Sequence, residues 1–155
     1  MLPPIRDYDA LYAEFRWRIP ARYNIGAHVC DRWAAHDPGK LALLHVGADG
    51  GTEEVTFGAL RQTSNRIGNA LAAHGVFRGD RVAILLPQCP AVAATHIGVY
   101  KLGAVALPLA TLFGVEALAH RLKDSGAKAL VTNSAGAAKV AAIAGRMRGR
   151  RVHGG

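Results

Sequence analysis

The chain has 155 residues and a mass of 16.4 kDa; half of its residues are apolar and 19% are charged. A chain of this length and composition buries a core of its own, which excludes wholesale disorder and a fold that depends on disulfides. The two cysteines, Cys30 and Cys89, form no CxxC pair. The sequence therefore shows neither a disulfide framework nor the spacing of a zinc site.

The formal net charge of +8 is unevenly distributed. Residues 139–155 carry five basic side chains and no acid, whereas residues 1–138 carry 14 basic and 11 acidic side chains. Such a basic end can attract nucleic acid or anionic lipid, or it can be a solvated, frayed terminus. Because it lacks aromatic residues for base stacking, we favour the frayed terminus and expect no nucleic-acid binding.

Two features argue against a secreted or membrane protein. The first residues, MLPPIRDYDALYAEF, carry charges where a signal peptide needs an apolar core. The most apolar stretch, residues 90–110, is interrupted by His96, Lys101 and Pro108, so a membrane span is not expected. The predicted location is the cytoplasm.

Apolar residues at helical spacing predict two short helices near the N-terminus. The first carries one apolar stripe: Tyr8, Leu11, Tyr12 and Phe15. The second begins after the capping residue Asn24 and has one apolar face: Ile25, Val29 and Trp33. The apolar run at 41–46, the turn at 48–51 and the segment 53–56 then predict a β-hairpin.

The rest of the chain alternates between helices and strands. Thr56 is a plausible cap for the first of these helices, and Gly75 has the position of a C-terminal glycine. The expected buried side of that helix is Phe57, Leu60, Ile67, Ala70 and Leu71. Strands are predicted at 81–86, 104–107 and 129–132, separated and followed by helices at 91–102, 115–124 and 135–144.

This order predicts an α/β fold: N-terminal helices and a β-hairpin, followed by a layered parallel sheet with flanking helices. The five consecutive apolar residues at 82–86 indicate a strand covered on both faces. We expect residues 1–144 to form one domain and residues 145–155 to be a disordered or out-of-frame tail rich in glycine and arginine.

No catalytic or metal-binding constellation is visible, since the sequence lacks GxGxxG, a P-loop, HExxH and GxSxG. A ligand of a parallel sheet binds beyond the carboxyl ends of the strands, here the loops at 87–88, 108–114 and 133–134. In the middle loop, Thr111 offers a hydroxyl, Phe113 a stacking face and Gly114 flexibility near a helix N-terminus that favours anions. The alternative is an ordinary connection between a strand and a helix.

Four segments together resemble one family. They are TFGAL at 56–60 with SNR at 64–66, GDRVAILLP at 79–87, GAVALP at 103–108, and RLKDSGAK at 121–128. In this order they are similar to the N-terminal region of AMP-forming acyl-CoA synthetases, which are adenylate-forming enzymes. FRW at 15–17, YN at 23–24 and CDR at 30–32 look most like the acetyl- and medium-chain branch. Ala59 is one departure, because the family usually has a glutamate there.

The resemblance implies part of the large N-terminal domain of an acid–CoA ligase. Such an enzyme uses ATP and Mg²⁺ to convert a short or medium carboxylic acid to an acyl-adenylate, and then transfers the acyl group to coenzyme A. In the family, the phosphate loop, the adenine-binding segment and the mobile C-terminal domain follow the region matched here. The 155 residues alone are therefore expected to be inactive, with no catalytic residue and no metal ligand among them.

Of the family's functional residues, the resemblance assigns positions in this chain only to those that contact coenzyme A. Thr111, Leu112 and Phe113 fall where acetyl-CoA synthetases contact the nucleotide end of coenzyme A. Lys139 lies near a position where such enzymes direct an arginine toward the coenzyme A phosphates. The alternative for Lys139 is a solvated helix lysine.

Two further expectations concern the end of the chain. A truncated parallel sheet leaves an edge unpaired, which favours self-association. Residues 145–155 also lack the strand pattern that the family has there, so we hypothesise an interrupted or frameshifted gene whose other reading frame encodes the phosphate loop. The alternative is a stand-alone, non-catalytic binding or interaction module with a basic tail.

Overall fold

The computed structural model describes residue 4 and residues 6–149, with side chains described as far as residue 143. In chain order the elements are α1 (Tyr8–Glu14), the π-helical η1 (Ala27–Asp31), α2 (Arg32–His36), β1 (Leu41–Val46), β2 (Thr52–Thr56), α3 (Phe57–Ala73), β3 (Arg81–Leu85), α4 (Pro90–Lys101), β4 (Val105–Pro108), α5 (Val115–Ser125), β5 (Ala129–Thr132) and α6 (Ser134–Gly149). The predicted α/β fold is confirmed. None of the helices in the described part combines the length and apolar character of a membrane span.

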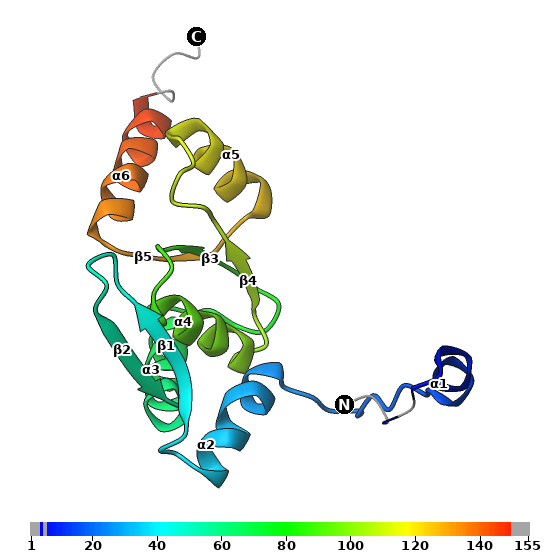
Figure 1. Cartoon of the computed structure of the whole chain (residues 1–155). Helices are drawn as coiled ribbons and strands as arrows, with labels where there is room; N and C mark the ends of the chain where they lie inside the picture. The colour runs from blue at the N-terminus through cyan, green and yellow to red at the C-terminus, as the bar shows by residue number, and fades with distance from the viewer. Residues whose placement is uncertain (1–3, 5, 150–155) are drawn as a thin grey trace.

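The core is organised around a three-stranded parallel sheet with the order β4-β3-β5. Ala83 of the central strand lies opposite Leu107 of β4 and Leu130 of β5. Helices α3 and α4 cover one face of the sheet, and α5 and α6 cover the other (Figure 1). Accordingly Val82, Ala83, Ile84 and Leu85 are all buried, which confirms a strand covered on both faces.

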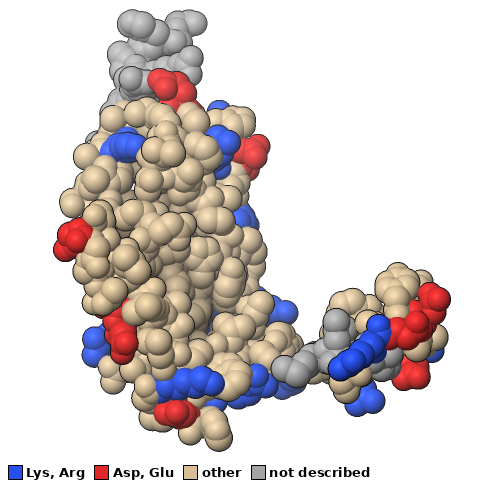
Figure 2. Space-filling model, in the orientation of Figure 1, with Lys and Arg blue, Asp and Glu red and all other residues tan. Residues whose placement is uncertain are grey.

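The antiparallel hairpin of β1 and β2 packs beside the sheet against α3 and α4. Its inward side chains join a third core cluster around Leu60, Ala94 and Ile97. On β1, Leu44 and Val46 are instead largely exposed. Figure 2 shows that charged side chains lie mostly around the margins of the face in view, so the broad centre of that face carries few charges.

Both predicted ends of α3 are confirmed. The Thr56 hydroxyl oxygen accepts a hydrogen bond from the amide of Ala59 at 3.2 Å, as a helix cap should. At the other end Gly75 has a φ of +79°, and the amide of Val76 donates to the Leu71 carbonyl at 3.0 Å. This is the Schellman arrangement, for which glycine is the favoured residue.

The buried side of α3 differs from the expected one. Ala70 is exposed, whereas Ser64 and Gly68 are buried. The reason is the closeness of α4: a Cβ on Gly98 would lie only 2.8 Å from the Ser64 carbonyl oxygen, and one on Gly68 would lie 3.4 Å from the Gly98 carbonyl oxygen. Small residues are selected here because the two backbones are in direct contact.

The N-terminal segment departs furthest from its expected packing. Helix α1 has no buried residue, and its stripe residues Tyr8 and Tyr12 are about three-quarters exposed, at 73% and 75%. A stretch without helix or strand carries α1 away from the body of the molecule (Figure 1). The spacing of the apolar residues predicted the helix, but it could not show whether another part of the chain packs against the apolar stripe.

The next helical segment is capped as predicted but buries another face. The Asn24 side-chain oxygen accepts from the Ala27 amide at 3.0 Å. Ile25 and Val29 are exposed, and the buried residues are instead Gly26, Cys30 and Ala34. A Cβ on Gly26 would lie 2.8 Å from the carbonyl oxygen of Ile97 in α4, so only a face of small residues can approach this closely.

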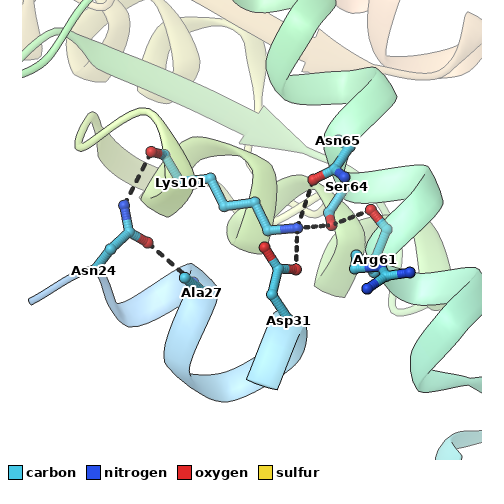
Figure 3. Close-up of polar contacts among 7 residues, drawn as sticks. All are labelled: Asn24, Ala27, Asp31, Arg61, Ser64, Asn65 and Lys101. Atoms are coloured by element: carbon cyan, nitrogen blue, oxygen red, sulfur yellow. Dashed lines mark hydrogen bonds and ion pairs between the residues drawn. The ribbon is translucent and has the colours of Figure 1, made fainter. Parts of the chain in front are cut away.

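A polar cluster at the end of α4 holds this segment in place (Figure 3). The Lys101 ammonium lies 2.6 Å from Asp31 Oδ1 and donates to Ser64 Oγ at 2.9 Å and to Asn65 Oδ1 at 2.7 Å. The Asn24 amide donates to the Lys101 carbonyl at 3.0 Å. Among the described residues, the buried Asp31 Oδ1 meets only this ammonium. One lysine thus ties η1 to both α3 and α4.

A second cluster joins the starts of β3 and β5. Asp80 Oδ2 accepts from the Phe77 amide at 2.7 Å and from the Lys128 ammonium at 3.0 Å. The hydrogen bond from the Phe77 amide, followed by the one from Lys128, lowers the pKa of Asp80 below its ordinary value of 3.8. Arg81 Nε donates to the Ser125 carbonyl at 2.9 Å. The motifs at 79–87 and 121–128 are therefore neighbours in space.

Helix α6 extends beyond the expected end at residue 144 and reaches Gly149. The first five residues of the expected tail are consequently helical in their backbone. Residues 150–155, the remainder of that tail, lie outside the described residues.

Gly98→Ala should lower the free energy of unfolding by about 1–3 kcal/mol, because the added methyl group forces two packed helix backbones apart. Chemical denaturation measures the change. Gly39→Ala is the matched control, since a Cβ there meets only Asp37 Oδ1 at an ordinary 3.6 Å. A Gly98→Ala chain as stable as the control would contradict the close approach.

Lys101→Met should destabilise the chain by about 1–3 kcal/mol, because it keeps the apolar stem but leaves the carboxylate of Asp31 without its partner. Asp31→Asn combined with Lys101→Met should recover part of this loss. Lys123→Met, at an exposed lysine on α5, is the control. Equal stabilities of the Lys101 and Lys123 variants would show that the cluster adds nothing.

Candidate functional site

A cavity of about 210 Å³ lies at the carboxyl ends of the parallel strands. Its lining residues come from β3, from the three loops that follow the strands and from α6: Leu85, Pro87, Thr111, Asn133, Ala135, Gly136 and Lys139. The expectation that the three loops open on one edge of the sheet is thereby confirmed. Ligands of open α/β sheets bind at this edge.

The wall of the cavity is the first turn of α6, which approaches the sheet very closely. A Cβ on Gly136 would overlap Thr132 Oγ1 and lie 3.2 Å from Leu85 Cδ2, so no larger residue fits. The Thr132 hydroxyl donates to the Leu85 carbonyl at 2.8 Å, and the Asn133 side-chain oxygen accepts from the Gly136 amide at 3.0 Å. The turn is therefore fixed to β5 and β3 by sterics and hydrogen bonds together.

Two of the four predicted binding residues meet at this cavity. The Lys139 ammonium, one turn further along α6, donates to the Thr111 carbonyl at 2.6 Å. The two residues are 28 positions apart in the sequence and both line the cavity. Their contact bridges α6 and the loop between β4 and α5.

The other two predicted residues lie on the same loop but outside the cavity lining. Leu112 is 94% exposed. Phe113 is half-buried and packs against the core cluster that contains Leu118. The guanidinium of Arg121 lies 4.1 Å from the centroid of its ring. The core and Arg121 thus already contact the ring of Phe113, and its role as a stacking face for a ligand stays a prediction.

Sequence reasoning missed several residues of this region. Asn133 was placed only in a loop, although Asx residues before a helix are a recognisable capping signal. Gly136 carried no signal of its own, and Arg121 was recognised only as the first residue of the motif at 121–128. Glycine is needed at 136 because Thr132, four residues earlier, and Leu85, far away in the sequence, leave no room for a Cβ. Arg121 lies on α5 and its guanidinium contacts the ring of Phe113, which precedes that helix.

The electrostatic character of the site is positive. The first turn of α6 contains no acidic residue, and its N-terminus and the Lys139 ammonium both favour an anion. The two ion pairs of the described residues, Lys101–Asp31 and Lys128–Asp80, lie elsewhere. The described residues contain no group of three or more His, Cys, Asp or Glu side chains that could hold a metal ion. The arrangement suits a phosphate or carboxylate group.

Neither cysteine belongs to this cavity. Cys30 is fully buried in the third core cluster, and burial raises the pKa of its thiol although Lys101 opposes the shift. Cys89 is the cap residue of α4 and is half-buried beside His45 and Val92.

Comparison with known proteins gives a consistent result. A family model described as AMP-binding enzyme matches residues 30–153. An acetyl-coenzyme A synthetase of Bacillus subtilis is 37% identical over 139 residues, covering 83% of this chain and 24% of that protein. One from Caulobacter vibrioides is 32% identical over 155 residues, covering 97% of this chain and 23% of that protein.

The structural comparison agrees with these matches. The crystal structure of an acyl-CoA synthetase of Brucella canis superimposes with a TM-score of 0.80 at 36% identity. The superposition covers 88% of this chain and 26% of that protein. The chain spans about a fifth to a quarter of the length of the curated relatives that it matches. With the family match extending over most of its residues, the chain belongs to the family of AMP-binding enzymes, and the relatives compared here are named acetyl-coenzyme A synthetase.

Proposed function

We propose that the chain is the N-terminal part of an acid–CoA ligase. Such a ligase activates a short or medium carboxylic acid with ATP to an acyl-adenylate and transfers the acyl group to coenzyme A. Family membership supports this proposal, and so do the relatives named acetyl-coenzyme A synthetase. The relatives are about four to five times longer, so their whole reaction is proposed for a longer polypeptide and not for these 155 residues. A cytoplasmic location is part of the same proposal.

The contribution we assign to this chain is one side of the coenzyme A site. The observation that carries it is the contact between Lys139 and Thr111 across the cavity, because it brings two separately predicted residues together. The nucleotide end of coenzyme A bears phosphates, which match the Lys139 ammonium and the N-terminus of α6. Leu112 offers an exposed apolar contact beside them, and Phe113 supports the loop from below.

ATP and Mg²⁺ require groups that the described residues do not bring together. A triphosphate with magnesium needs acidic ligands and a loop that cradles phosphates. The described residues form no such cluster of acids. We therefore assign ATP and Mg²⁺ to regions that the longer relatives have in addition, and we derive no chemical step from the residues present.

A second candidate is a stand-alone interaction module. Its support is the sheet itself, because within residues 6–149 β4 and β5 each pair on one side only, which leaves two edges for another strand. The same edges favour self-association. Light scattering distinguishes the candidates: a stable monomer with one cooperative unfolding transition favours the module, and an aggregate that a complementary C-terminal segment rescues favours the ligase.

The chain alone should show no ATP–pyrophosphate exchange with any acid in a panel from acetate to octanoate. The physical reason is the missing site for triphosphate and magnesium. A full-length acetyl-coenzyme A synthetase is the positive control. Exchange above the protein-free background, retained through purification of the 155-residue chain, would refute the assignment of adenylation to other regions.

Lys139→Gln should weaken coenzyme A binding to the chain by about fivefold, the effect of losing one exposed charge-assisted contact. Isothermal titration at constant ionic strength measures it. Lys123→Gln removes the same charge from an exposed position on α5, away from the cavity, and should leave the affinity unchanged. An equal loss of affinity in both variants would mean that coenzyme A binding depends on the net charge of the chain and not on the position of Lys139.

A further inference from the structure

The loop between β4 and α5 is held at its start, at its tip and at its end, and the tip itself forms a turn in which the Phe113 amide donates to the Ala110 carbonyl at 3.1 Å. At its start, the Leu109 amide donates to the Ile84 carbonyl at 2.9 Å, continuing the sheet. At its end, the ring of Phe113 packs into the core beneath Arg121. Between them, the tip is held by the Lys139 ammonium on the Thr111 carbonyl. Only this middle contact is made between exposed groups on the cavity rim.

The middle contact is also the one that an anion can replace. Lys139 directs a full positive charge at a neutral carbonyl, and the acids of both described ion pairs belong to other lysines. A hydrogen bond between an ammonium and a phosphate joins two ionised groups and is stronger than one with a neutral acceptor. A phosphate entering the cavity mouth therefore outcompetes Thr111 for Lys139.

The contacts at the end of the loop, in contrast, do not depend on Lys139. The Arg121 guanidinium lies over the Phe113 ring and donates to the Ala117 carbonyl at 3.3 Å. Even with Arg121 displaced, the ring stays packed against the cluster around Leu118. Release of Lys139 thus leaves the tip at 110–112 held by the turn bond between the Phe113 amide and the Ala110 carbonyl, while the ring of residue 113 stays anchored in the core.

We propose that the bond from Lys139 to Thr111 is a strap across the cavity that a phosphate-bearing ligand opens by taking Lys139 as its own partner. The ligand class is a phosphate or pyrophosphate ester. This inference rests on the proposed coenzyme A site and adds its regulation: phosphate binding and loop release are one event. Arg121 acts as a positioning residue, which keeps the freed tip beside the cavity.

Amide hydrogen exchange of the loop, followed by NMR on the ¹⁵N-labelled chain, tests the strap. Inorganic pyrophosphate is the probe, titrated to millimolar concentration with sodium chloride adjusted to keep ionic strength constant. Exchange at the Phe113 amide, which is bonded to the Ala110 carbonyl across the tip, should become about fivefold faster on saturation, as loss of one exposed contact implies. Exchange at Leu109, whose amide is bonded to β3, should not change.

Three variants sharpen the experiment. Lys139→Gln should show fast exchange at the Phe113 amide without pyrophosphate and no further response. Lys139→Arg retains a cation and should behave like the unchanged chain. Lys123→Gln matches the lost charge on a helix face away from the cavity, and its loop should respond normally. All four proteins are first shown to unfold at the same denaturant concentration, so that differences in exchange report on the loop alone.

Two results would overturn the strap: slow, pyrophosphate-independent exchange at the Phe113 amide in the unchanged chain, or identical loop exchange in Lys139→Gln and the unchanged chain. The experiments also distinguish failure of the strap proposal from failure of the proposed coenzyme A site. Loop release by pyrophosphate without coenzyme A binding would keep the strap and refute the site. Coenzyme A binding that depends on Lys139 while the Phe113 amide stays protected would keep the site and refute the strap.

Discussion

The central strand β3 has to be covered on both faces, and the arrangement of the other layers depends on that requirement. Val82 joins the cluster formed with α3 and α4, whereas Ala83 and Leu85 join the cluster formed with α5 and α6. Because strands in a parallel sheet all end at one edge, the loops after β3, β4 and β5 meet there. The cavity at this edge is therefore a direct result of how the core is built, and its last core residue, Leu85, is also part of the cavity lining.

Close packing against glycines, where a side chain would not fit, gives this scaffold its geometry. Gly98 brings α4 against α3, Gly26 brings the N-terminal segment against α4, and Gly136 brings α6 against the ends of β3 and β5. The last of these contacts matters most for function. It places the first turn of α6 at the cavity wall, and from there Lys139 reaches the Thr111 carbonyl. The close packing around Gly136 thus determines where the Lys139 ammonium lies on the cavity rim.

Local signals predicted much of this structure, whereas the choice of buried face depended on distant neighbours. The strand at 129–132, the cap Thr56 and the glycine at 75 were recognisable because each acts through residues next to it in the chain. Ser64 and Gly68 were missed because the backbone of α4 selects small residues there. At the site, the loop and Lys139 were predicted from family resemblance, but the covered ring of Phe113 was not. Its neighbours, the core and Arg121, become visible only in three dimensions.

The central claim is that the nucleotide end of coenzyme A binds at the carboxyl edge of the sheet. Adenosine 3′,5′-bisphosphate, which is that end of the molecule, can be titrated into the ¹⁵N-labelled chain while the amide chemical shifts are followed by NMR. The account predicts that the shifts change at residues 111–112 and 133–139, around the cavity. Changes confined to another hollow, such as the groove formed by residues 20–25 and 100–104, or no change at saturating nucleotide, would contradict it.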